Sequence, residues 1–138
     1  MIHLARILLL LLVTVIAQAQ EEGGAIEVKI LQIENAKGQM LIGPYDSEES
    51  WLKKPAKGVF GKIIDGQSEA NSTNLPDSTY AISVYHDADD DGELDTLLGI
   101  PTEDTGSSND TPARFGPPKW EEAKFEVKGG TVKQIINL

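Results

Sequence analysis

The stretch with the most obvious chemistry is an acidic segment at residues 87–95, which holds six acids and no base. It reads DADDDGELD and follows the pattern D-x-D-x-D-G-x-x-D. Two like charges about 4 Å apart repel by roughly 1 kcal/mol in water and by about 4 kcal/mol at an effective dielectric constant near 20. An ordered loop of this composition therefore needs a partner for its charge, and a hard cation bound by oxygen fits that need.

The spacing matches the first nine positions of a calcium-binding loop. In such loops, positions 1, 3 and 5 supply carboxylates, a glycine at position 6 makes the sharp turn, position 7 offers its backbone carbonyl and position 9 a further oxygen. Gly92 stands at position 6. The remaining positions give the predicted set of calcium ligands: Asp87, Asp89, Asp91, Glu93 and Asp95.

The match ends before position 12, where an EF-hand carries a bidentate glutamate and this chain carries Leu98. The loop therefore resembles calcium loops between β-strands, and a sixth ligand is expected from Glu103, Asp104 or water. Affinity should be modest, on the order of 10⁻⁴ to 10⁻³ M, as in extracellular calcium modules. The chain has no cysteine and only one histidine near the loop, which argues against transition metals. The alternative is a solvated acidic turn that binds no specific ligand.

His86 precedes the acidic loop and raises a second possibility, because a histidine beside a carboxylate can carry out acid–base chemistry. The alternative function is therefore a calcium-assisted hydrolase that uses His86. No serine lies in a nucleophile motif, and no phosphate-binding glycine loop is present. His86 also continues the alternation of the preceding strand, so it could equally pack or form a hydrogen bond there. The leading hypothesis is a non-enzymatic protein, and a carrier of an apolar ligand between two sheets stays open.

The N-terminal residues 1–19 have the pattern of a secretory signal peptide. Arg6 supplies positive charge, residues 7–16 form an apolar core, and residues 17–19 read A-Q-A, a small-x-small cleavage pattern. Such a core is too short to span a bilayer well. We therefore expect an exported protein, periplasmic or secreted, with no membrane insertion after cleavage. An uncleaved N-terminal anchor is the alternative.

The chain from residue 20 to residue 138 is expected to form a single domain. Without Arg6 it holds 11 basic and 22 acidic residues, so its formal charge is 11 − 22 = −11. This balance argues against nucleic acid and anionic membrane surfaces as partners. The absence of cysteine means that the domain folds without disulfides, on a core of modest size.

Alternation of apolar and polar residues predicts about seven short strands. The clearest is 79–85, where Tyr80, Ile82 and Val84 share one face. The predicted strands cover residues 25–33, 39–45, 57–65, 66–74 (an edge strand or a loop), 79–85, 121–127 and 131–138. This pattern indicates an all-β fold, an antiparallel β-sandwich.

The connections carry predictions of their own. Residues 35–38 read as a hairpin turn, and a β-bulge is expected near Leu31. One short helix is expected near 46–53, since Asp46 can cap its start and a proline follows it. Trp51 and Leu52 of this helix should face the core, with Trp51 as a structural anchor.

Residues 96–119 hold four prolines and three glycines and show no periodicity. A loop of this length inside a compact domain is usually functional or held by a ligand. Calcium at its start would order it as a surface for a protein or glycan partner.

Five stretches together resemble a known family. Its motifs run LP-x-G-x-YA-x-x-x-x-HD, then NGKLD followed by GIP-x-E, then GFSN followed by GPP-x-F-x-DA-x-F. The corresponding stretches here are LPDSTYAISVYHD at 75–87, DGELD at 91–95, LGIPTE at 98–103, GSSN at 106–109 and GPPKWEEAKF at 116–125. On these residues the chain resembles the DUF2141 family of exported bacterial proteins, over roughly residues 24–138.

The resemblance implies an exported β-sandwich, related in shape to immunoglobulin-like or transthyretin-like domains, and no established activity. The chain departs from the family pattern at several positions. Asp89 and Asp91 stand where the family often has asparagine, which keeps oxygen ligands and adds charge. Asp77 replaces a glycine, Asp104-Thr105 replaces a Gly-Tyr pair, and Ser107 replaces a phenylalanine.

Overall fold

The structure is a computed structural model that describes residues 23–138. The predicted signal peptide at 1–19 lies outside the described residues and stays a prediction. Across residues 23–138, no helix combines the length and the apolar character needed to cross a membrane.

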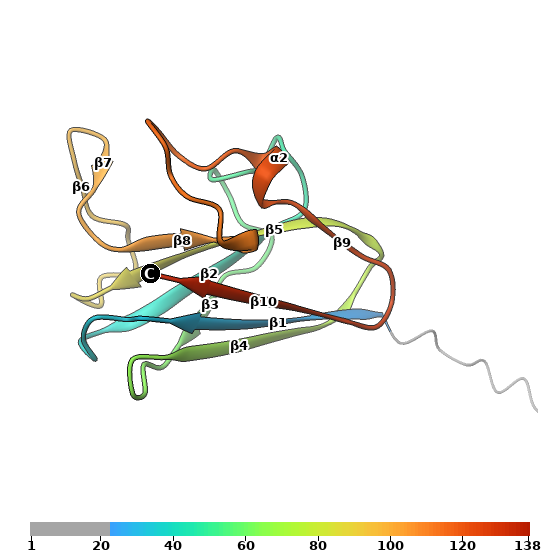
Figure 1. The fold of residues 1–138 in the computed structure, drawn as a ribbon, viewed down its shortest axis with the longest axis horizontal. Coiled ribbons are helices and arrows are strands. Elements are labelled where there is room, and N and C mark those ends of the chain that lie inside the picture. The colour runs from blue at the N-terminus through green and yellow to red at the C-terminus, as the bar shows by residue number, and fades with distance from the viewer. Residues whose placement is uncertain (1–22) are drawn as a thin grey trace, which may run out of the picture.

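Two β-sheets pack face to face (Figure 1). Sheet A contains, in order, β10 (Thr131–Asn137), β1 (Gly24–Leu31) and β4 (Ser68–Leu75). Sheet B contains, in order, β3 (Val59–Gly61), β2 (Gln39–Tyr45), β5 (Ser78–Asp87) and β8 (Thr105–Ser107), and β9 (Phe125–Val127) also pairs with β5. The prediction of an all-β sandwich of mainly antiparallel strands is confirmed, with ten strands among the described residues instead of about seven.

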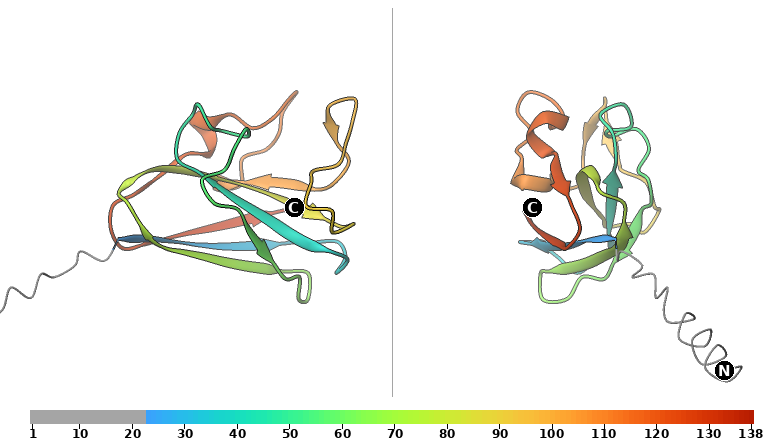
Figure 2. Two further views of the ribbon diagram at one scale, coloured as in Figure 1. Left: turned by 180° about the vertical axis from the view of Figure 1, so that it is seen from behind. Right: turned by 90° about the vertical axis from the view of Figure 1, so that its right-hand side faces the viewer.

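The strand β5 is the centre of sheet B. It pairs antiparallel with β2, from Gln39 opposite Asp87 to Tyr45 opposite Ala81. Its other edge is divided, because its first residues pair with β9 and its later residues pair with β8. In sheet A, β1 pairs antiparallel with β4 and parallel with β10. Figure 2 shows the two layers from behind and from one side.

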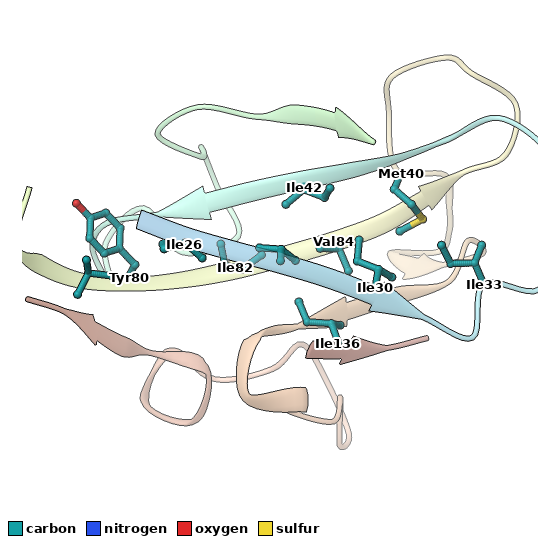
Figure 3. Close-up of a cluster of buried hydrophobic side chains, with 11 residues drawn as sticks. Ile26, Ile30, Ile33, Met40, Ile42, Tyr80, Ile82, Val84 and Ile136 are labelled. Atoms are coloured by element: carbon teal, nitrogen blue, oxygen red, sulfur yellow. The ribbon is translucent and has the colours of Figure 1, made fainter. Parts of the chain in front are cut away.

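The main core lies between the two sheets and is built from alternate residues of β1, β2 and β5 (Figure 3). Burial of one such side chain contributes about 1.5–3 kcal/mol relative to exposure. The alternation predicted for the strands around Val28 and Ile82 is confirmed. The buried core residues are Ile26, Val28, Ile30, Ile33, Met40, Ile42, Tyr80, Ile82, Val84, Val127 and Ile136.

A second apolar cluster contains Ala81, which alternates with the core residues of β5 and so faces the opposite side of sheet B. Trp51 packs edge-on against Tyr45 and Trp120, with ring centroids 5.0 and 6.0 Å apart. Its indole Nε1 donates a 2.8 Å hydrogen bond to the carbonyl of Pro118. Trp51 therefore joins the 46–55 segment to the segment that precedes β9, which is the role of a structural anchor.

The short helix expected near 46–53 does not form. Consecutive turns occupy residues 48–53 instead, closed by the hydrogen bonds from Trp51 N to Glu48 O and from Lys53 N to Ser50 O. Leu52 adopts a positive φ of 57° and is exposed, contrary to the prediction that it faces the core. Within residues 46–53, only Trp51 packs in the second cluster. A single buried side chain does not form the apolar face that would stabilise a helix.

A helix takes the place of the start of a predicted strand. The predicted strand 121–127 is correct only from Phe125, because α2 (Trp120–Ala123) precedes it. Trp120 and Ala123 are three residues apart, so a helical turn buries both on one side. Acidic residues in the first turn also favour the helix.

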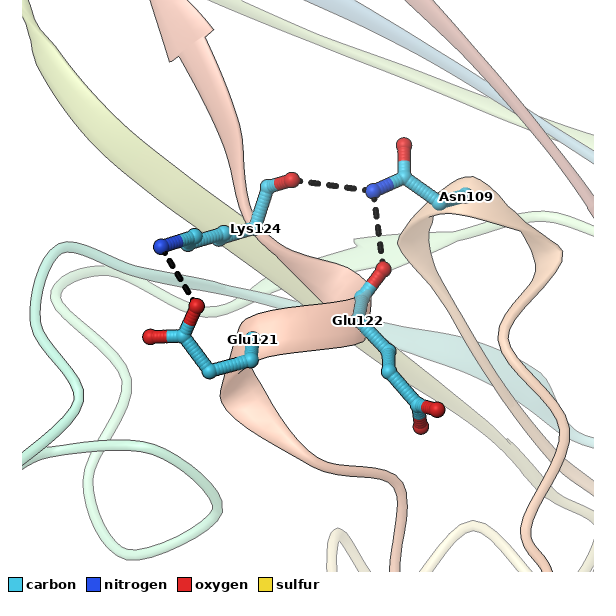
Figure 4. Close-up of polar contacts among 4 residues, drawn as sticks. All are labelled: Asn109, Glu121, Glu122 and Lys124. Carbon is cyan, nitrogen blue, oxygen red and sulfur yellow. Dashed lines mark hydrogen bonds and ion pairs between the residues drawn. The ribbon is translucent and has the colours of Figure 1, made fainter.

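Polar contacts fasten α2 to the 3₁₀ turn η2 (Ser108–Asp110), as Figure 4 shows. The side-chain amide of Asn109 donates hydrogen bonds to the carbonyls of Glu122 (3.0 Å) and Lys124 (2.9 Å). The Lys124 ammonium pairs with Glu121 at 2.7 Å. The second half of the 96–119 segment is thus held by the protein itself.

The 96–119 segment contains regular structure, contrary to the prediction. It includes the hairpin of β6 (Thr96–Leu97) and β7 (Ile100–Pro101), followed by β8 and η2. Elements of two or three residues are too short to produce a recognisable period.

Two further predictions are wrong. Residues 35–38 do not close a hairpin, since β1 belongs to sheet A and β2 to sheet B. The alternation of a strand identifies its buried face and not its partner, so a sheet-to-sheet crossing looks the same in the sequence. The irregularity in β1 lies between Gly24 and Ile26 where it pairs with β4, and β1 simply ends at Leu31.

Candidate metal centre

The acidic loop begins where β5 ends. His86 and Asp87 are the last residues of β5 and pair with Met40 and Gln39 of β2. The side chains of His86 and Asp87 are buried, with exposed fractions of 4% and 0%. Strand pairing therefore fixes the position of the first predicted ligand.

The carboxylate of Asp87 organises the turn that follows it. Its Oδ2 accepts hydrogen bonds from Gly92 N (2.9 Å) and Gln39 Nε2 (3.2 Å), and its Oδ1 accepts one from Asp91 N (3.2 Å). Burial by itself raises the pKa of Asp87, but hydrogen bonds, above all those from Gln39 and Gly92, outweigh it and hold this pKa below its usual value. Asp87 is thus kept ionised inside the protein.

The chain turns tightly between Asp87 and Glu93. Asp90 and Gly92 have positive φ values of 56° and 76°, a conformation that aspartate tolerates and glycine adopts freely. Glu93 N donates a 2.9 Å hydrogen bond to Oδ1 of Asp91. Gly92 therefore occupies the position that the calcium-loop pattern assigns to the turn.

Glu103 closes the loop from the other side. Its Oε2 accepts a hydrogen bond from Ala88 N (3.0 Å) and its Oε1 accepts one from Asp95 N (2.8 Å). Thr102 N also donates to Asp95 O at 2.9 Å. One carboxylate thus connects the start of the loop to its end, and it sits at the base of the β6–β7 hairpin.

Five carboxyl groups converge in two overlapping triads. In each triad the oxygen atoms lie within 4.8 Å of one another. The first consists of Asp87, Asp89 and Asp91, and the second of Asp89, Asp95 and Glu103. Asp89 belongs to both, so it stands at the middle of the cluster.

The crowding of carboxyl groups changes the pKa of Asp89. Its pKa is raised to about 6, because desolvation disfavours the charged form and because it shares hydrogen bonds with the carboxyl groups of Asp87 and Asp95. A hydrogen bond between two carboxyl groups requires a proton, so these contacts favour the protonated form of Asp89. Asp89 itself is exposed, so this shift arises at the surface of the loop and not in the core.

No lysine or arginine forms an ion pair with this cluster among residues 23–138. The ion pairs of that part of the chain join Lys29 to Glu69, Lys124 to Glu121, Lys128 to Glu126 and Lys133 to Glu27. The donor set is entirely oxygen, which suits a hard cation such as calcium and not a soft metal.

The structure places the predicted ligands unequally. Four of them (Asp87, Asp89, Asp91 and Asp95) belong to the triads, whereas the carboxylate of Glu93 belongs to neither. In the calcium-loop pattern, the residue at the position of Glu93 supplies its backbone carbonyl, whereas the triads contain side-chain atoms only. Glu103, named from the sequence only as one option for a sixth ligand, lies in the second triad. Asp104 contributes its backbone carbonyl to His86 N at 2.9 Å.

His86 is engaged in a structural contact. Its Nε2 lies 2.6 Å from the carbonyl oxygen of Lys37, and because a carbonyl only accepts, Nε2 carries the proton. This bond ties the crossing between the two sheets to the end of β5. Only Nδ1 would remain available as a base, and the imidazole is buried, with an exposed fraction of 4%.

Comparison with known proteins adds one match. The family described as "Uncharacterized protein conserved in bacteria (DUF2141)" matches residues 28–135, from β1 to β10, and so includes the whole acidic loop and Glu103. No curated protein and no solved structure gives a significant match.

Proposed function

Given that the chain belongs to the DUF2141 family, as its motifs predict, we propose that it is an exported, non-enzymatic β-sandwich domain whose acidic loop binds calcium structurally. The family description assigns no activity. The proposal therefore rests on the loop itself.

The observation that carries the proposal is the central position of Asp89. One carboxyl group lies in both triads, its pKa is raised to about 6, and no basic side chain among residues 23–138 pairs with the cluster. A divalent cation would favour the charged form of Asp89 against the desolvation and the carboxyl contacts that raise this pKa. It would also supply the counter-charge that the fold does not.

The ligands proposed for the cation come from both ends of the loop. Asp87, Asp89 and Asp91 would act from the start of the loop, and Asp95 and Glu103 from its end. The backbone carbonyl of Glu93 and water are further candidates, as in other calcium loops. Because Asp95 and Glu103 flank the β6–β7 hairpin, calcium would hold the hairpin against β5 and order it as a surface for a protein or glycan partner.

The calcium affinity expected for this loop is consistent with an exported protein. A loop that lacks the bidentate glutamate should bind calcium on the order of 10⁻⁴ to 10⁻³ M, which suits extracellular modules and not cytosolic sensors. The secretory pattern of residues 1–19 supports the same compartment.

A structural role is favoured over the hydrolase alternative by the contacts of His86. Its Nε2 already donates to the Lys37 carbonyl, and the imidazole is buried. The proposal therefore assigns His86 to the fold.

The test is thermal unfolding of the purified, metal-stripped protein with increasing calcium or magnesium. Calcium should raise the midpoint of the wild type, and Asp89→Asn should abolish the response. Asp90→Asn is the matched control, because Asp90 lies in the same loop, outside both triads, at a positive φ that asparagine tolerates. A response to magnesium alone would contradict calcium and indicate a smaller, wetter site. If neither ion shifts the midpoint at several times the expected dissociation constant, about 10⁻³ M, the cation proposal is wrong.

A further inference from the structure

The β6–β7 hairpin carries an exposed leucine where turn geometry favours other residues. Leu97 pairs with Ile100, so Leu98 and Gly99 form a two-residue turn, with φ values of 52° and 79°. Two positive φ values characterise a type I′ turn, whose first position strongly prefers asparagine, aspartate or glycine. Leu98 is 97% exposed, so packing within the domain does not explain it.

A second loop repeats this combination. Phe115 has a φ of 54° and is fully exposed, with a relative exposure of 112%. It lies in the segment 111–119 that leads into α2. That segment and the β6–β7 hairpin extend away from sheet A on the same side of the molecule in Figures 1 and 2.

Large apolar side chains in left-handed conformations at exposed tips conflict with both local preference and burial. Such conflicts persist at functional sites, where another requirement outweighs them. We propose that Leu98 and Phe115, with the exposed strand residues of the hairpin, form a docking surface for a protein partner. We name this set the apolar tips: Leu97, Leu98, Ile100 and Phe115.

The charges beside the apolar tips indicate the chemistry of the partner. Glu93 precedes the hairpin and Asp104 follows it; both are exposed and neither belongs to a triad, so bound calcium would leave their charges free. Arg114 and Lys119, both in the segment that carries Phe115, are the exceptions. With a net charge of −10, the chain repels anionic membranes and a second copy of itself. The partner that fits is a protein with an apolar depression bordered by lysine or arginine.

This inference deepens the proposed function, because calcium at Asp95 and Glu103 would hold the hairpin that presents Leu98. The hairpin base depends on the bonds from Asp95 N to Glu103 and from Thr102 N to Asp95 O. Docking should therefore be stronger with calcium than with a chelator.

The probe is a fluorescent synthetic helical peptide with one leucine face and one lysine face, and the readout is its anisotropy with the full protein in calcium. The double substitution Leu98→Ser/Phe115→Ser should weaken binding about tenfold or more, since two large apolar contacts are lost. The matched control is Ile135→Ser, because Ile135 is 55% exposed on β10 of sheet A, away from the tips. A peptide with glutamate in place of lysine should not bind.

Equal binding by the wild type and by Leu98→Ser/Phe115→Ser would overturn the docking surface, as would an equal loss in Ile135→Ser. Binding through the tips to phosphatidylcholine–phosphatidylglycerol vesicles but not to the peptide would overturn the protein partner in favour of a membrane. The calcium-induced rise in unfolding midpoint, measured on the same double variant, separates the two proposals. If calcium raises the unfolding midpoint of the double variant and the variant binds the peptide as well as the wild type does, the calcium site stands and the docking surface is wrong. If calcium does not raise the midpoint and the variant binds the peptide more weakly than the wild type, only the calcium site is wrong.

Discussion

Glu103 accepts a 2.8 Å hydrogen bond from the backbone N–H of Asp95, across the base of the β6–β7 hairpin. Through its second oxygen the same carboxylate holds Ala88, so it joins the two ends of the acidic loop. The loop is therefore closed by a residue outside the D-x-D-x-D-G-x-x-D pattern.

Replacement of Glu103 by alanine should destabilise the protein. Both hydrogen bonds to Glu103 involve a charged acceptor, and such bonds contribute about 1.5–3 kcal/mol each when buried and less when exposed. We expect a loss of about 1–3 kcal/mol in the free energy of urea unfolding. The control is Asp104→Ala, since the neighbouring Asp104 contributes a backbone carbonyl and not its side chain. An equal loss in both variants would contradict the role given to Glu103.

Asp87 and Asp89 should respond in opposite directions to the same substitution. In Asp87→Asn, the new NH₂ group would face N–H donors in either orientation: Gly92 N and Gln39 Nε2 at the Oδ2 position, or Asp91 N at the Oδ1 position. A buried donor left unsatisfied costs about 1–3 kcal/mol. In Asp89→Asn, one negative charge leaves the crowded cluster, so the metal-free protein should unfold at a higher temperature than the wild type. Differential scanning calorimetry of the two variants in the presence of a chelator measures both changes in unfolding temperature. Destabilisation by Asp89→Asn would show that the cluster is not repulsive.

The stability of the metal-free protein should depend on pH through Asp89. Its pKa is about 6 in the folded protein against an ordinary value of 3.8, so the folded state binds more protons between these values. Stability should therefore increase as the pH falls from 7 through 6 toward 4. Asp87 has a lowered pKa, and its contribution is lost only at still lower pH.

Urea unfolding at several pH values checks this dependence. Asp89→Asn should remove the gain below pH 7. Saturating calcium should reverse the pH dependence of the wild type, because protons and calcium compete for the same oxygens. An unchanged gain in Asp89→Asn would assign the titration to another group.

His86→Leu should destabilise the fold without a specific effect on calcium. The substitution leaves the part-buried Lys37 carbonyl without its protein partner, so the loss should lie at or below the roughly 1–3 kcal/mol of a fully buried acceptor. Lys37→Ala is the control, since it keeps the carbonyl. Calcium titration by calorimetry should give similar affinities for His86→Leu and the wild type. A catalytic His86 would instead show as lost hydrolysis at unchanged stability in a panel of ester and phosphate substrates.

The alternating strands were predictable, and their partners were not. Ile26, Val28 and Ile30 reveal a buried face because the side-chain period of a strand is two. The pairing of β1 with β10, and the crossing at residues 35–38, depend on the whole fold and leave no local signal. Ala123 continues the period-two alternation of Phe125 and Val127, and this strand-like pattern hid the helical spacing of Trp120 and Ala123, so α2 was missed.

The candidate site was predictable to the extent that it is local in sequence. Asp87, Asp89, Asp91 and Asp95 follow a fixed spacing, and the structure brings them together. Glu103 joins them because the β6–β7 hairpin returns the chain to the loop. The spacing from Asp95 to Glu103 has meaning only after that hairpin is known.

The parallel pairing of β1 with β10 also governs when the domain can fold. Ala25 lies opposite Thr131, so the central strand of sheet A has only one of its neighbours until residues 131–137 have left the ribosome. Contacts between such distant segments form late, because the loop that they close is long. For a chain that we propose is exported, this order of events favours a nascent chain that stays open until it has crossed the membrane.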